Sequence, residues 1–210
     1  TLVVSRGSLR LSDRVKKRLF DLAVASTALL FLAPLMLVVA IGIKLDSRGP
    51  VFFRQPRVGR NNLPFRIYKF RSMRQESCDF SGNRSTGRDD DRISRFGRFI
   101  RKTSIDELPQ LINVVKGDMS MVGPRPHALG STAEDQLFWE ISHRYWERHK
   151  LKPGITGLAQ VRGYRGATEK TSDLTDRLNS DLEYLAGWRL WRDIAILAAT
   201  LKVLVHPNAY

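Results

Sequence analysis

An aspartate is followed directly by a glutamate at one place in the chain, Asp106-Glu107. Ser104 stands just before the pair, and Ser-x-x-Glu fits a capping box, in which Ser104 and Glu107 satisfy free backbone donors at a helix start. A carboxylate there lies at the positive end of the helix dipole, and the free N–H groups suit a phosphate. Asp106 is therefore a candidate nucleophile toward phosphorus, as in enzymes that form aspartyl phosphates. Capping and catalysis are compatible, and the residues alone leave both open.

Two basic motifs could hold such a phosphate. KFRSM places Lys69 and Arg71 close together after a predicted strand, and GPRP holds Arg125 between two prolines. That turn leaves Arg125 little conformational entropy to lose, and a fixed guanidinium suits a bidentate phosphate contact; a plain surface turn explains it equally well. The histidines show no metal-ligand spacing, and the chain has no P-loop or GxGxxG. Three aspartates at 89–91 could bind a metal, although a charge run in a polar loop is more often just solvated.

The composition demands an anionic partner. The 210 residues carry 35 Lys and Arg against 21 Asp and Glu, a net charge of +14. Such a surplus suits nucleic acid, acidic lipid headgroups or phosphorylated substrates. The length allows one domain, with or without appendages. The single cysteine, Cys78, excludes a disulfide framework and fits a reducing compartment. Thr1 opens the sequence, and nothing before Asp21 resembles a signal peptide, so a fragment of a longer protein is one reading.

Residues 22–43 form an uncharged apolar segment long enough to cross a bilayer as a helix. Both flanks are basic, which marks both as cytoplasmic, and Pro34 removes a backbone donor and clashes with the preceding turn. A kinked helix that enters and leaves by one face satisfies both observations. A spanning helix stays open because such helices tolerate proline, whereas a buried helix of a soluble protein is disfavoured. The basic flanks are Arg14, Lys16, Lys17 and Arg18 before the segment, and Lys44, Arg48, Arg54, Arg57 and Arg60 after it.

The rest of the sequence predicts a small β element and several helices. Two short strands are expected, joined by a basic, turn-rich loop, and a polar mobile loop follows them. A basic amphipathic helix then suits an anionic membrane surface or the protein's own core. An aromatic, basic stretch is of a kind favoured at membrane interfaces. The expected strands are 51–53 and 65–70, the loop 75–91, the helices 93–101, 104–116 and 178–205 with a break near Gly187, and the aromatic stretch 136–150.

The motifs follow one another as KRLFD, the apolar segment, KLDSRGPVFFRQPRVG, KFRSM, RKTSIDELPQLINVVKGDMSMVGPRP, KPGITGLAQVRG and DLEYLAGWRLWRDIAIL. In this order they resemble the bacterial sugar transferases, the monotopic polyprenyl-phosphate phosphoglycosyl transferases, from about residue 14 to 206. The resemblance implies an α+β, predominantly helical fold with amphipathic interfacial helices. Residues 1–13 would be an N-terminal extension and 14–48 a re-entrant membrane helix-break-helix with Pro34 at the break. Residues 49–210 would be a catalytic domain on the cytoplasmic face, forming one functional unit with 14–48. Ala33 stands where some members have serine before this proline.

The resemblance also implies a two-step reaction. Asp106 would attack the β-phosphate of a UDP-sugar, release UMP and keep a phosphosugar, which undecaprenyl phosphate would then accept. Glu107 would complete the catalytic dyad, and magnesium would sit between Asp106 and the diphosphate. The positions that match phosphate-contacting cations of the family are Lys69, Arg71, Arg101 and Arg125, and Asp181 matches a functional acid near the C-terminal end.

The C-terminal motifs resemble those of exopolysaccharide and capsule enzymes, which use glucose 1-phosphate or galactose 1-phosphate at the first membrane step. Glucose is the expected sugar, with an N-acetylated or diacetamido sugar as the alternative. The expected location is the bacterial inner membrane with the active site on the cytoplasmic face. The expected partners are a UDP-sugar, undecaprenyl phosphate and the lipid bilayer, with no nucleic acid and with a homodimer as a candidate assembly. A reading from another class is a non-enzymatic adaptor that uses its basic residues to bind acidic lipid or nucleic acid.

Overall fold

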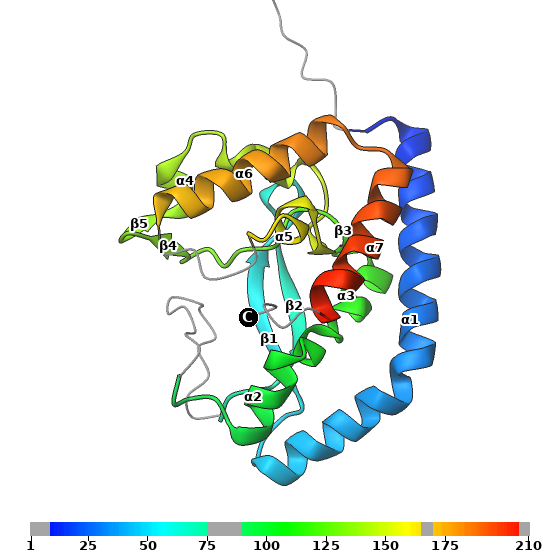
Figure 1. Ribbon diagram of the computed structural model, residues 1–210, viewed down its shortest axis with the longest axis vertical. Helices are drawn as coiled ribbons and strands as arrows, with labels where there is room; N and C mark the ends of the chain where they lie inside the picture. Colours follow the sequence, from blue (N-terminus) through cyan, green and yellow to red (C-terminus); the bar gives the residue numbers. More distant parts are fainter. Residues whose placement is uncertain (1–8, 75–89, 165–169, 206–210) are drawn as a thin grey trace, which may run out of the picture.

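The computed structural model describes residues 9–74, 90–164 and 170–205. A long N-terminal helix, α1, runs along one side of an α+β domain that contains short β pairs (Figure 1). The expected α+β class with an apolar N-terminal helix is thus confirmed. The elements are α1 (Leu11–Asp46), β1 (Phe52–Val58), η1 (Arg60–Asn62), β2 (Pro64–Phe70), α2 (Arg95–Lys102), η3 (Ile105–Glu107), α3 (Gln110–Lys116), β3 (Ser120–Val122), β4 (Thr132–Ala133), β5 (Gln136–Leu137), α4 (Phe138–Ile141), η4 (Tyr145–Lys150), β6 (Gly154–Thr156), α5 (Leu158–Val161), α6 (Thr171–Ala186) and α7 (Leu190–Val205).

Helix α1 stays helical through Pro34, so the expected break is not an interruption of the helix. The ribbon instead bends part-way along α1 (Figure 1), and an internal proline is a common cause of such a bend. Within the described residues α1 is the helix whose length and composition would allow it to cross a membrane. Large apolar side chains project from it into open space, including Leu30 and Phe31, which are 73% and 76% exposed. An outer surface of this kind is suited to lipid.

Both ends of α1 pack on the same domain. In its first half Ala25 is fully buried in the main core, and near its end Val39 and Ile43 pack with Phe70 and Ile100. The approach of α2 to the second half is close: a Cβ at Gly42 would lie 2.5 Å from the Phe96 ring. The two halves of the helix are therefore held by separate parts of one globular body.

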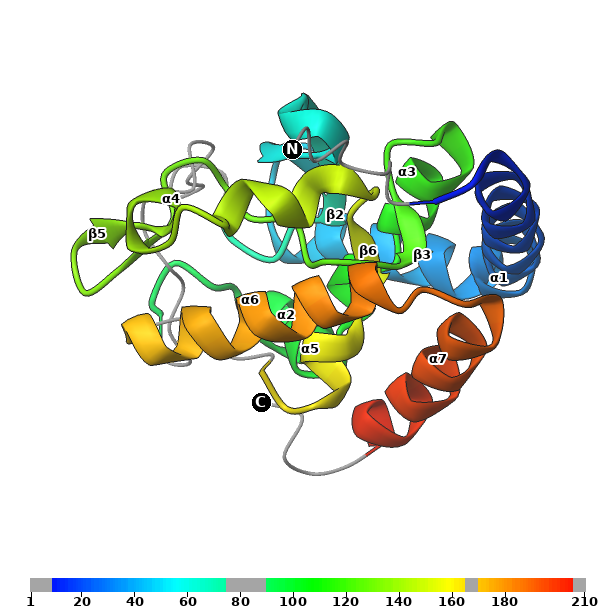
Figure 2. The same ribbon diagram turned by 90° about the horizontal axis from the view of Figure 1, so that it is seen from above.

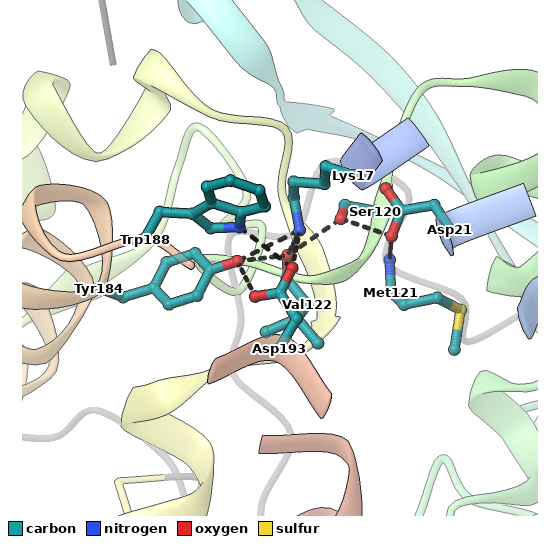
Figure 3. A network of polar contacts seen from close by, with 8 residues as sticks. All are labelled: Lys17, Asp21, Ser120, Met121, Val122, Tyr184, Trp188 and Asp193. Carbon is teal, nitrogen blue, oxygen red and sulfur yellow. Dashed lines mark hydrogen bonds and ion pairs between the residues drawn. The ribbon is translucent and has the colours of Figure 1, made fainter. Parts of the chain in front are cut away.

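A buried polar cluster holds the first half of α1 against α7 and β3 (Figure 3). The Lys17 ammonium lies 2.6 Å from Asp193 of α7 and also donates to the Val122 carbonyl. Tyr184 and the Trp188 indole donate to the same carboxylate. Asp193 is 0% exposed, and it has three donors around it, which is the saturation that a buried charge requires.

The β1–β2 hairpin is longer than the sequence indicates. Its antiparallel register runs from Phe52 opposite Phe70 to Val58 opposite Pro64, so residues 54–58, expected in a loop, belong to β1. The stretch 54–64 is basic and rich in turn-forming residue types, which is why it was expected to be a loop. Pro56 is tolerated in β1 because a two-stranded sheet has only edge strands, where a missing N–H costs little. The turn itself uses positive φ at Asn61 and Asn62, which asparagine adopts more readily than most residues.

A short parallel pair lies in the main core. Ser120 of β3 is opposite Gly154 of β6, and Val122 is opposite Thr156. A Cβ at Gly154 would lie 2.1 Å from the Gly123 backbone nitrogen, so this contact requires glycine. Helix α7 packs against both strands of this pair. Seen from above, α6 ends toward α1 and α7 turns back from there (Figure 2), and the expected break between the two helices at Gly187 is confirmed.

The aromatic stretch 136–150 contributes much of its apolar surface to the protein's own core. Phe138 and Tyr145 are buried and pack with Ala133 and Leu174. These two rings therefore serve internal packing. Trp139 and Trp146 stack on each other with centroids 5.8 Å apart.

Candidate active site

Asp106 and Glu107 lie on the short 3-10 turn η3, between α2 and α3. The expected continuous helix from 104 to 116 is wrong, because α3 begins only at Gln110. Pro109 has no N–H to donate an α-helical hydrogen bond. The residues before it instead form 3-10 hydrogen bonds, such as the one from the Leu108 N–H to the Ile105 carbonyl. The capping box is also absent: Ser104 has φ 57° and its side chain caps no backbone N–H of this turn.

Glu107 is the centre of a charge cluster. Its Oε1 accepts from Lys69 Nζ at 2.8 Å and from Arg125 Nη2 at 2.7 Å, and its Oε2 accepts from Arg125 Nη1 at 3.2 Å. Burial alone would raise the pKa of Glu107, but the charges and hydrogen bonds of Arg125 and Lys69 outweigh it and hold the pKa well below its usual value. Glu107 is therefore ionised and saturated, which suits it to positioning these cations and not to accepting a proton.

Asp106 has the opposite environment. It is only 7% exposed, and no residue within the described part of the chain donates a hydrogen bond to its carboxylate. Burial, together with the negative charge of Glu107, raises the pKa of Asp106 to about 6, although Lys69, Arg101 and Arg125 pull it down. Asp106 is therefore mostly ionised at neutral pH, poorly solvated and without a donor among the described residues, an environment that favours nucleophilic reactivity.

The loop that carries Arg125 is held by the core on both sides. Gly123 N–H donates to the Thr156 carbonyl at 2.9 Å, and Gly154 N–H donates to the Pro124 carbonyl at 3.0 Å. The Arg125 carbonyl itself accepts from Arg148 Nη2 at 2.8 Å. The rigid turn expected from the two prolines therefore gains further restraint from contacts that lie far away in the sequence.

Arg148 and Asp181 form a buried pair behind this loop, 2.6 Å apart. Asp181 accepts from Arg148, and Arg148 donates to the Arg125 carbonyl, so Asp181 positions Arg148 against the backbone of Arg125. Arg148 also contacts His127 Nδ1 at 2.7 Å. Burial and then the charge of Arg148 hold the pKa of His127 well below its usual value, so its neutral ring accepts this hydrogen bond.

The cations Lys69, Arg101 and Arg125 are all close enough to change the pKa of Asp106, so the structure brings these three predicted residues together. It does not bring Arg71 to them. Arg71 is buried and donates to the Ser47 and Arg48 carbonyls at the end of α1. Arg148 was missed, since its surroundings in the sequence show only an aromatic, basic segment.

Within the described residues no group of three or more His, Cys, Asp or Glu side chains could hold a metal ion alone. Of the aspartate run, Asp89 lies outside the described residues, and Asp90 pairs with Arg92. Magnesium, however, is often bound by one or two carboxylates together with substrate phosphates. The carboxylate of Asp106 fits that use, and no other described acid shares the site with it except the saturated Glu107.

Comparison with known proteins identifies relatives along most of the chain. The family model described as "Bacterial sugar transferase" matches residues 12–207. An "Undecaprenyl-phosphate glucose phosphotransferase" of Komagataeibacter xylinus is 50% identical over 95% of this chain, which spans 38% of that relative's length. The "Exopolysaccharide production protein PSS" of Rhizobium leguminosarum bv. phaseoli is 48% identical over 90% of this chain and 94% of its own length. A "UDP-glucose:undecaprenyl-phosphate glucose-1-phosphate transferase" of Caulobacter vibrioides is 45% identical, over 96% of this chain and 74% of its own length.

Proposed function

The chain belongs to the bacterial sugar transferase family, and from this premise we propose that it transfers glucose 1-phosphate from UDP-glucose to undecaprenyl phosphate. Two of the relatives above are named for transfer of glucose phosphate to undecaprenyl phosphate. The observation that supports this chemistry most directly is Asp106, a buried carboxylate without a donor among the described residues, beside three cations. The reaction would supply the first lipid-linked sugar for exopolysaccharide, capsule or O-antigen synthesis.

We assign the nucleophile to Asp106. An Asp106 oxygen forms a bond to the β-phosphorus of UDP-glucose, and the bond from that phosphorus to the bridging oxygen breaks, so UMP leaves with both electrons. An undecaprenyl phosphate oxygen then attacks the same phosphorus, and Asp106 leaves as a carboxylate. Neither step requires Asp106 to carry a proton, which agrees with a carboxylate that is ionised at neutral pH.

Glu107 holds the cations that receive the diphosphate. Because its oxygens bind Arg125 and Lys69, both cations are directed to one place before substrate arrives, and preorganised charges of this kind stabilise developing negative charge. Magnesium, when bound between Asp106 and the diphosphate, would lower the repulsion between carboxylate and phosphate. Asp106 is the residue that would hold it.

The first half-reaction is expected to have an acid limb near pH 6. Asp106 attacks only when ionised, and its pKa of about 6 means that kcat/KM for UMP release falls about tenfold per pH unit below that value. The measurement is a pH series of single-turnover UMP release. Undecaprenyl phosphate is left out because it is a phosphate monoester that itself titrates near pH 6 and would obscure the titration of Asp106. An acid limb near pH 4 would show that the environment does not raise the pKa of Asp106.

The direct test of the activity is release of UMP by the purified chain in a lipid or detergent environment with magnesium. UDP-glucose is expected to give UMP, and adding undecaprenyl phosphate is expected to convert one turnover into many. UDP-galactose and UDP-N-acetylglucosamine serve as comparison substrates that test the choice of sugar. No UMP from any nucleotide sugar, in a sample that retains its folded structure, would falsify the transferase reading.

We also propose that α1 is re-entrant in the cytoplasmic leaflet of the bacterial inner membrane. Its apolar side chains are exposed midway along the helix. Both ends form hydrogen bonds with the same domain: Lys17 donates to Asp193, and the Ser47 carbonyl accepts from Arg71. Two ends held by one folded body reach the same side of a bilayer. Acidic headgroups on that side would complement the net charge of +14.

Cysteine labelling tests this topology. In a Cys78→Ser background, Lys16→Cys and Arg48→Cys place one thiol at each end of the apolar segment, at exposed positions. We expect both to react with a membrane-impermeant maleimide from the cytoplasmic side only. Reaction from opposite sides would establish a spanning helix and exclude re-entry.

A further inference from the structure

A cavity of about 260 Å³ lies beside the start of α1, and five of its lining residues are cationic. It includes none of the residues around Asp106. The start of α1 and helix α2, which directly precedes Asp106, lie toward opposite ends of the long axis of the molecule (Figure 1), so this cavity is separate from the active site. Its cations are Arg14, Lys17, Arg18, Arg60 and Lys152.

The acid and one of the cations in this cavity already have partners within the protein. Asp21, which also lines it, accepts from the Ser120 hydroxyl and from the Met121 N–H, both at 2.9 Å, and Lys17 is neutralised by Asp193. Arg18 donates to the carbonyls of Val114 and Val115 at the end of α3. These contacts neutralise Lys17, but among the described residues they leave the charge of Arg18 without an acidic partner.

The remaining cations, Arg14, Arg60 and Lys152, form no ion pair with any residue that the structure describes. The Nε of Arg60 is buried and has no hydrogen-bond partner there. Burial, and then the positive charges of Arg18 and Arg60, lower the pKa of Lys152, although the negative charges of Asp21 and Asp118 offset part of this effect. A Cβ at Gly117 would lie 3.4 Å from Lys152 Nζ and 3.5 Å from Arg18 Nη2, so these two like charges lie over the same small residue. Such a convergence of like charges is unfavourable. Asp21 and Asp118 reduce the repulsion without forming an ion pair with Lys152, and an anion bound between the cations would reduce it further.

We propose that this cavity binds a phosphate group. Several forked or ammonium donors around a small space are suited to phosphate oxygens. The uncharged segment of α1 begins at Leu22, one residue after Asp21 of the cavity wall, which places the cavity where a membrane-inserted helix meets the headgroups. A phospholipid headgroup and free inorganic phosphate present the same chemistry, and the location favours the headgroup.

The test uses the full chain with two variants of equal charge. Arg60→Gln with Lys152→Gln removes two cavity cations, whereas Lys16→Gln with Arg189→Gln removes two cations outside it. One arm reconstitutes each protein in phosphatidylcholine with or without phosphatidylglycerol and measures phosphatidylglycerol retained after detergent extraction, by native mass spectrometry. The other arm measures the rise in melting temperature caused by inorganic phosphate in detergent. Lys152→Arg, which keeps the charge, checks that a cavity substitution itself is tolerated.

We expect wild type, the control double variant and Lys152→Arg to retain phosphatidylglycerol, and the cavity variant to retain at least about tenfold less, because it loses two charge-assisted contacts. Cavity-dependent stabilisation by inorganic phosphate without lipid retention would support the phosphate site and identify a soluble occupant. Equal retention and equal stabilisation in the cavity variant and the control double variant would overturn the proposal. UMP release in detergent is expected to stay within about twofold in both double variants, since neither changes a group near Asp106. This outcome separates the cavity from the proposed reaction.

Discussion

Asp106→Asn is expected to lower UMP release by at least about 10³-fold, because removal of a covalent nucleophile abolishes the step that it performs. The amide has nearly the same shape but cannot attack phosphorus as a carboxylate does. The same variant is expected to form no phosphosugar adduct when UDP-glucose is supplied without undecaprenyl phosphate. Intact-protein mass spectrometry after a rapid quench measures the adduct, which wild type is expected to accumulate.

Loss of activity in this variant is expected without loss of stability. The folded protein raises the pKa of Asp106 from 3.8 to about 6, so the folded state holds a proton there more tightly than the unfolded chain does. Ionisation of Asp106 therefore lowers the contribution of this residue to the free energy of unfolding as pH rises through this window, by about 2 to 3 kcal/mol in total. The amide introduced by Asp106→Asn has no charge to desolvate. The melting temperature of the variant at pH 7 is expected to equal or exceed that of wild type.

Asp176→Asn is the matched control, since Asp176 is an exposed acid on α6 and its neutralisation is expected to leave both UMP release and stability unchanged. Undiminished UMP release by Asp106→Asn would exclude the covalent mechanism assigned to Asp106. If every activity and the lipid binding survived, a non-enzymatic adaptor would explain the protein better.

Asp193→Leu is expected to lower the free energy of unfolding by about 3 to 5 kcal/mol, because it leaves the buried Lys17 ammonium without its counter-ion. The pair lies 2.6 Å apart with both side chains almost inaccessible to solvent. Tyr184 and Trp188 lose an acceptor in the same change. The measurement is urea-induced unfolding in detergent, followed by tryptophan fluorescence and circular dichroism.

A double variant separates the unpaired charge from the loss of packing. Lys17→Met combined with Asp193→Leu replaces the pair by apolar side chains, and such replacements of buried pairs are often close to neutral. The double variant is therefore expected to be more stable than Asp193→Leu alone. Additive losses from the two single substitutions would show that Lys17 and Asp193 contribute separately, and that the ion pair is not what fastens α1.

Patterns of neighbouring residues in the sequence predict those helices and breaks that residues close together in the chain determine. The apolar run and its basic flanks indicate α1, and Gly187 marks the break between α6 and α7. The Ser104 capping box failed because Pro109 stops the helix that it would begin. The first strand is longer than predicted because turn-forming residues such as Pro56 can lie in an edge strand, and the sequence does not show that β1 is one.

The candidate active site could be predicted only in part, because many of its supporting contacts join residues far apart in the sequence. Asp106, Glu107 and Arg125 stand in motifs with distinctive local chemistry, and the resemblance of those motifs to one family supplied their roles. The supporting contacts are non-local: Lys17 and Asp193 are 176 positions apart, and Arg148 and Asp181 are 33 apart. Periodicity cannot pair such residues, since each looks like an ordinary surface charge in its own segment. Arg71 stands two positions after Lys69 in the same motif, but its guanidinium donates to the Arg48 carbonyl at the end of α1, a contact that the motif does not indicate.

Attachment of α1 at both ends fixes its length as well as its position. Each residue inserted between Lys17 and Ser47 would rotate the two ends relative to each other by about 100° and separate them by about 1.5 Å. Lys17 and Asp193, or Ser47 and Arg71, would then no longer meet. In the membrane topology proposed above, the depth that α1 reaches is therefore set by its two attachment points, and not by the length of a freely tethered helix. Adaptation of this segment to different lipids is then expected through the side chains on its exposed face, with the number of residues between the two attachment points unchanged.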